Sequence, residues 1–113
     1  MFKIEKETSI RWPVTVNVPR DGGRITKATF GVRFELIPAD EFATIYRDGG
    51  NDEDLLRRAV TGWDSDVADA EGTPLAYSTD ALDQLIGITD VRAGMVAAYI
   101  ECSSGKAAAR KNL

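Results

Sequence analysis

The stretch Val14-Thr15-Val16-Asn17-Val18-Pro19-Arg20-Asp21-Gly22-Gly23-Arg24, with Phe30-Gly31-Val32-Arg33-Phe34-Glu35-Leu36 after it, decides the fold. In both segments apolar residues alternate with polar or small ones, which is the period of a strand with one buried face. The step Asp21-Gly22-Gly23 supplies residues that tolerate positive φ, as a hairpin turn requires. The sequence therefore predicts an antiparallel β-hairpin. Its water-facing side would carry Thr15, Asn17, Arg33 and Glu35.

The hydrophobic period changes from two to that of a helix after Pro38. Phe42, Ile45 and Tyr46 recur at helical spacing, and Asp40 is the expected N-cap of a short helix. Gly49-Gly50 would end that helix.

A second helix is predicted to begin at the acidic residues 52–54 and to carry Arg57 and Arg58 in its last turns, an order that suits the helix dipole. Its apolar face would be formed by Leu56, Ala59, Val60 and Trp63. For Trp63, packing in the core is favoured over a role as a partner-binding anchor, because it completes this helical face.

Residues 64–77 are expected to form a loop or a small extended excursion, because Asp, Ser, Gly and Pro interrupt every apolar run. Ser78 is the expected cap of the next helix, with Gly87 as its C′ residue, and Thr89 would open the last helix, the two helices forming a hairpin. The predicted fold class is α+β: an N-terminal antiparallel β-hairpin or small sheet followed by helices packed on one face. We expect a single domain over residues 1–104 and a flexible basic tail over residues 105–113.

The composition is that of an ordinary soluble globular protein, with 113 residues, 43% apolar and 28% charged residues, and a net charge of −4. The acidic residues cluster between Asp48 and Asp83, so the folded body lacks the basic face that nucleic-acid binding needs. No apolar run is long enough to cross a membrane or to act as a secretory signal, which favours a cytoplasmic protein.

The sequence contains no histidine and one cysteine, Cys102, whose place on an apolar helix face predicts a buried thiol. Cys-His pairs, Ser-His-Asp triads and zinc clusters are therefore excluded. The acidic run 64–72 departs from a calcium loop, because Ala68 and Asp69 stand where a ligand and a glycine are required. Its paired carboxylates are better explained as a solvated loop than as a glycosidase site. We expect no catalytic residue, metal or cofactor.

The last helix carries an apolar arc wider than one packing contact needs, which favours a second contact with another subunit or with a client protein. The residues of this arc predicted to bind a partner are Val91, Met95, Val96, Tyr99 and Ile100. The basic tail, with Arg110 and Lys111, is either a solvated end or a segment that orders on a partner.

The chain from Val60 to Asn112 resembles the tail assembly chaperones of long-tailed bacteriophages and prophages. The resemblance lies in the Gly62-Trp63 step before a charged turn, in Pro74-Leu75-Ala76-Tyr77-Ser78 leading into a capped helix, and in the tail Lys106-Ala107-Ala108-Ala109-Arg110-Lys111-Asn112. It covers a little under half of the chain and contains no catalytic motif.

The resemblance implies a chaperone that binds the tape measure protein, keeps it soluble and helps to recruit tail tube subunits. A homo-oligomer is expected from the wide apolar arc of the last helix. It also implies an extended form, made by ribosomal frameshifting, through which the tail tube protein is recruited. Ser104-Gly105-Lys106 and Arg110-Lys111-Asn112 can both be encoded by slippery heptamers. The alternatives are a small structural tail protein (a tube, terminator or connector subunit) and a small regulatory binding protein of the host.

Overall fold

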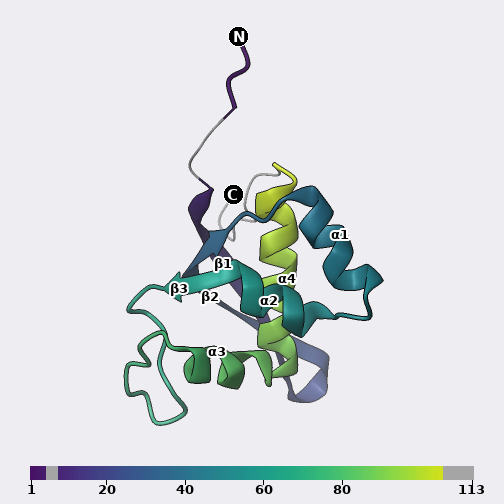
Figure 1. The fold of residues 1–113 in the computed structure, drawn as a ribbon. Helices are drawn as coiled ribbons and strands as arrows, with labels where there is room; N and C mark the ends of the chain where they lie inside the picture. The colour runs from purple at the N-terminus through teal and green to yellow at the C-terminus, as the bar shows by residue number, and fades with distance from the viewer. Residues whose placement is uncertain (5–7, 106–113) are drawn as a thin grey trace.

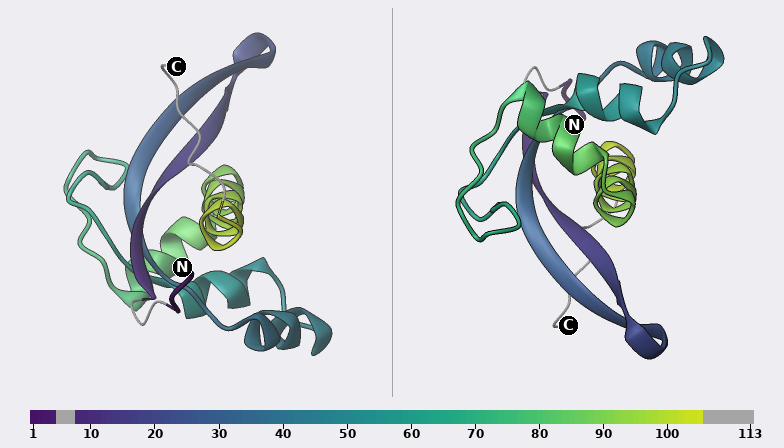
Figure 2. Two further views of the ribbon diagram at one scale, coloured as in Figure 1. Left: turned by 90° about the horizontal axis from the view of Figure 1, so that it is seen from above. Right: turned by 90° about the horizontal axis from the view of Figure 1, so that it is seen from below.

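A computed structural model describes residues 1–4 and 8–105 of the chain. A long antiparallel hairpin, formed by β1 (Ser9–Arg20) and β2 (Arg24–Glu35), curves around the last helix (Figure 1 and Figure 2). The helices lie on the concave side of this hairpin, and the loop after residue 63 lies on its other side (Figure 2). The predicted α+β class and the predicted hairpin are confirmed.

The hairpin is paired along its whole length, from Ser9↔Glu35 to Arg20↔Arg24. Its turn, Asp21–Gly23, places both glycines at a φ of 80°, a conformation that glycine adopts without steric cost. The register puts Val14, Val16, Val32 and Phe34 in the core, and Asn17 and Arg33 remain exposed. The alternation in the sequence thus set the buried face.

The described residues also form four α-helices: α1 (Ala39–Arg47), α2 (Asp52–Ala59), α3 (Thr79–Ile86) and α4 (Thr89–Ser103). Two of them begin at side-chain caps. Asn51 and Asp54 form a capping box at α2, which the sequence analysis did not predict. At α3 the Ser78 hydroxyl accepts from the Ala81 N–H, so the predicted cap at Ser78 is confirmed. The helices α3 and α4 contact each other but cross steeply, so they do not lie side by side as a simple helical hairpin (Figure 1 and Figure 2).

The predicted extension of the second helix to Trp63 is wrong. Helix α2 ends at Ala59, and Val60–Trp63 form a third strand, β3, which pairs antiparallel with β2 through Val32↔Trp63 and Phe34↔Val60. Val60 and Trp63 favour strands as well as fitting a helical face, and the open edge of β2 supplies hydrogen-bond partners that a longer helix would not use. The sheet order is β1-β2-β3, so β1 is an edge strand.

Two predicted helix ends also differ in detail. Pro38 stands at the N-cap of α1 without a side-chain hydrogen bond, and Asp40 lies inside the first turn. Gly87 keeps a helical φ of −69° as the C-cap of α3 and does not adopt the left-handed conformation.

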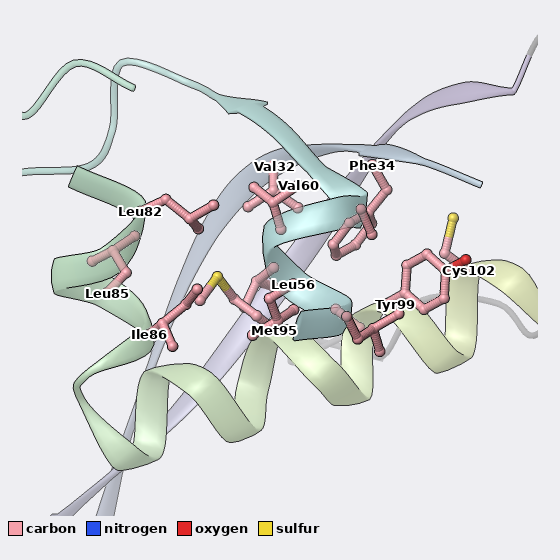
Figure 3. Packing of buried hydrophobic residues seen from close by; sticks show 14 of the residues in the cluster. Val32, Phe34, Leu56, Val60, Leu82, Leu85, Ile86, Met95, Tyr99 and Cys102 are labelled. Carbon is pink, nitrogen blue, oxygen red and sulfur yellow. The ribbon is translucent and has the colours of Figure 1, made fainter. Parts of the chain in front are cut away.

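The core lies between the sheet and the helices α2, α3 and α4 (Figure 3). Its largest fully buried side chains are Tyr99, Phe34, Leu55, Leu56, Ile86 and Met95. The Tyr99 ring packs edge-on against Phe34 at 5.4 Å, and its hydroxyl accepts from the Ile37 N–H at 3.1 Å. Among the helices of the described residues, none is long and apolar enough to cross a membrane.

Candidate functional site

Helix α4, the element predicted to bind partners, packs across β1 and contacts α2 and α3 as well. Its core-facing side carries Met95, Ala98, Tyr99 and Cys102, all buried. Val91 and Val96 are half-buried at the margin of the core, and Ile100 is 43% exposed. Of the predicted arc, Val91, Val96 and Ile100 therefore keep some contact with the surface, and Val96 and Ile100 lie one helical turn apart.

Two of the predicted partner-binding residues, Met95 and Tyr99, lie in the core of the domain. Both are at most 1% exposed, and Figure 3 shows Met95 directed toward Leu56 and Ile86. The arc is wide because α4 is covered by the sheet on one side and by α2 and α3 on another, so most of its width is used inside the domain. Arg110 and Lys111 lie outside the described residues.

The residues that carry the resemblance before α3 form one packed unit. The Trp63 indole N–H donates to the Leu75 carbonyl at 2.8 Å, and the Tyr77 hydroxyl donates to the Val60 carbonyl at 3.1 Å. The rings of Trp63 and Tyr77 meet edge-on with centroids 5.0 Å apart. These residues fix the return of the chain from β3 to α3, so their role in this fold is structural.

The acidic run after Trp63 is held by hydrogen bonds of its own. The Asp69 carboxylate accepts from the backbone N–H groups of Glu71 and Thr73, both at 3.0 Å, and Asp64 pairs with Arg11 across the face of the sheet. Arg11 lowers the pKa of Asp64 by hydrogen bonding to its charged form, despite the opposing effect of desolvation. Within residues 1–4 and 8–105, no three His, Cys, Asp or Glu side chains are grouped as a metal site.

Burial raises the pKa of the Cys102 thiol above its ordinary value. The side chain is 7% exposed and belongs to the core cluster. A thiol that stays protonated and covered is a poor nucleophile, so Cys102 fits the predicted role as a small buried apolar residue.

Sequence reasoning missed a hollow of about 730 Å³ between the outer half of the hairpin and the first turns of α4. We call it the hairpin groove. It is lined by Thr15, Asn17, Val18, Pro19 and Ile25 of the hairpin and by Thr89, Asp90, Ala93, Gly94 and Ala97 of α4. Gly94 lets the two elements approach, because a Cβ there would lie 2.6 Å from the Thr15 carbonyl oxygen. The one sequence signal for the groove is the run of small residues on α4.

The hairpin groove is mostly apolar, and Ile25 on its wall is 55% exposed. Asp90 is the one charged residue among the described residues that line it. A surface of this kind binds apolar segments and does not assemble catalytic groups.

No protein-family model matches the chain, and comparison with curated proteins and with solved structures gives no match either.

Proposed function

We propose that this protein is a cytoplasmic tail assembly chaperone of a long-tailed bacteriophage or prophage, and that it binds the tape measure protein and keeps it soluble. The tape measure protein is a long helical client whose apolar stripe must be hidden until tube subunits surround it. A small domain with an apolar surface on a rigid helix suits that task. Recruitment of the tail tube protein through a frameshifted, extended form belongs to the same proposal.

The observation that carries the proposal is the outer surface of α4. Ile100 is 43% exposed, and Val96 lies half-buried one turn before it. We call these two residues the α4 stripe. Met95 and Tyr99 anchor one side of α4 in the core. The helix therefore cannot rotate about its axis, and the α4 stripe keeps its position at the surface. An amphipathic helix of the client can pack against such a stripe through its own apolar positions.

The resemblance supports the same proposal from a second direction. Its residues in 60–78 are the ones that hold the β3–α3 connection, through Trp63, Leu75 and Tyr77. They set the position of α3, against which α4 packs. The part of the chain that resembles the chaperones is thus the part that positions the proposed client surface.

The test is copurification of a tagged tape measure protein with this chain after co-expression. Ile100→Asp should abolish copurification, because a charge would enter an apolar contact. Ile88→Asp is the matched control: Ile88 is 47% exposed on the step into α4, away from the stripe, and should leave copurification unchanged. Equal copurification with all three chains would contradict a client site on the α4 stripe. A tape measure protein that is soluble alone would favour the structural-subunit alternative.

A further inference from the structure

The α4 stripe and the floor of the hairpin groove lie on one side of α4. Ala93 and Ala97, which line the groove, are exposed, and Val96 and Ile100 form the stripe. These four residues follow one another at the spacing i, i+3, i+4 and i+7, so they share one helix face over about 10 Å. The two surfaces are therefore continuous, and a single partner can cover both.

The outer half of the hairpin stands beside this face as a wall. Figure 2 shows the end of the hairpin extending past α4. Around the axis of α4, Ala97 lies between Ile100 and Gly94, and Gly94 meets β1 at Thr15. The alanine floor thus has Ile100 on one side and the hairpin on the other. On the hairpin side the apolar wall includes Ile25, which is 55% exposed.

The backbone of the partner decides which kind of segment fits this groove. The lining is mostly apolar, and the outer edge of β1 is covered at Thr15, because a Cβ added at Gly94 would lie 2.6 Å from the Thr15 carbonyl oxygen. An extended segment cannot add a strand there, so N–H and C=O groups that it buried in the groove would lose hydrogen bonds to water. An α-helix pairs these groups within itself and brings only side chains to the groove. The groove therefore favours a helix.

The small residues of the floor suit the approach of a helix. Packed helices lie about 8–10 Å apart, and the side chains at the contact set the distance. Ala93 and Ala97 stand one turn apart and leave room between them and the hairpin for a row of larger side chains. A helix above this floor can reach Ile25 on one side and Ile100 on the other.

The charge of the groove indicates one further property of the partner. Asp90 is the charged residue of the lining, and it forms no ion pair with another described residue. It lies at the start of α4, so a basic side chain is favoured at that end of the bound helix.

We propose that the hairpin groove and the α4 stripe form one binding surface for an amphipathic α-helix of the client, with Ile25 as a contact residue equal in importance to Ile100. This inference rests on the proposed function and extends its client site from α4 to the hairpin. The helix inserts its apolar side chains between the hairpin and α4, as helices do in the grooves of other proteins.

The first test measures how much tagged tape measure protein copurifies with variants of the full chain. Ile25→Asp should lower the recovered amount at least about 10-fold, because it places a charge in an apolar contact. The double variant Ala93→Gln with Ala97→Gln should do the same by filling the floor, and glutamine is well tolerated in exposed helix positions. Thr26→Asp is the matched control: Thr26 is exposed, follows Ile25 in β2 and points to the opposite face.

The outcomes separate this inference from the proposed function. If Ile100→Asp lowers copurification and the groove variants do not, the client uses the α4 stripe alone and the extension to the hairpin is wrong. If none of these variants lowers it, both proposals fail. Melting temperatures close to that of the wild type would show that the variants are folded.

The second test asks whether the bound segment is a helix. Hydrogen exchange on the copurified complex locates the client segment that this chain protects, and a synthetic peptide of that segment is then titrated with the full chain. Binding should increase the helical circular dichroism signal, and a proline in the middle of the peptide should prevent binding. A peptide that binds without gaining helical signal, or that tolerates the proline, would overturn the inference.

Discussion

At the scale of single residues, the structure separates side chains that the sequence grouped together. Met95 and Ile100 both belong to the wide apolar arc of α4, yet Met95 is fully buried and Ile100 is 43% exposed. Helical periodicity shows which residues share a face, but it does not show how many neighbours cover that face. The packing of β1, α2 and α3 on α4 makes the distinction.

Truncation of these two residues should therefore have unequal effects. Met95→Ala should lower the free energy of unfolding by about 2–5 kcal/mol, because it leaves a cavity in a packed core. Ile100→Ala should lower it by less than about 1 kcal/mol, because its side chain already meets water. Urea unfolding at equilibrium measures both values. Similar losses for the two variants would contradict the assignment of Met95 to the core and Ile100 to the surface.

The pair formed by Arg11 and Asp64 predicts a dependence of stability on pH. Hydrogen bonds from Arg11 lower the pKa of Asp64 in the folded state. The pair therefore stabilises the protein above the unfolded pKa of an aspartate, about 3.9, and this contribution is lost as the pH falls through the lower folded value. The melting temperature of the wild type should exceed that of Asp64→Asn at pH 6, and the gap should narrow below about pH 4. A gap that stays constant to pH 2 would rule out this titration.

At the scale of elements, the sequence predicted the units whose signals are local. The hairpin follows from the alternation of 14–18 and 30–36, and the start of α3 follows from the cap at Ser78. Strand β3 could not be predicted in this way. Its residues fit both a helical face and a strand, and the free edge of β2, distant in sequence, decides between them.

Alanine should have opposite effects on stability at Gly94, where α4 meets β1, and at Gly87, the C-cap of α3. Gly94→Ala should destabilise the protein by about 1–3 kcal/mol, because the added Cβ would lie 2.6 Å from the Thr15 carbonyl oxygen and force α4 outward. Gly87→Ala should stabilise it by about 0.5–1 kcal/mol, because its φ is helical and the nearest atoms are 3.5 Å away. Thermal unfolding followed by circular dichroism compares the two. If Gly94→Ala instead raised the melting temperature, Gly94 of α4 and Thr15 of β1 would not be in close contact.

At the scale of the whole molecule, the surface features that suggest function come from tertiary structure. The hairpin groove joins Val18 and Ile25 to Ala93 and Ala97, which are far apart in the sequence. No periodic pattern places them together. Both residues of the α4 stripe were among the predicted partner-binding residues. They lie at the edge of the predicted apolar arc, whose other members include the buried Met95 and Tyr99.

The chain should also be inert toward metals. It contains no histidine, and the carboxylate of Asp69 in the acidic loop is engaged with the backbone of Glu71 and Thr73. Titration calorimetry with calcium, magnesium and zinc should show no saturable heat. Micromolar binding accompanied by a higher melting temperature would contradict this expectation.

The proposed frameshifted form depends on codons, which the gene sequence can supply. The heptamers would fall at Ser104–Lys106 or at 110–112, after the last helix, so slippage there would leave the helices and sheet intact. A slippery heptamer followed by an open −1 frame is the expected finding. If neither site contains one, this chain has no such extended partner.

The central claim, that the α4 stripe keeps a tape measure protein in solution, is tested most directly by one measurement: the soluble fraction of that protein on co-expression with the wild type, with Ile100→Asp and with Ile88→Asp. The account predicts a soluble client with the wild type and with Ile88→Asp, and an aggregated client with Ile100→Asp while this variant itself stays folded. A client equally soluble with all three chains, or with none of them present, would contradict it.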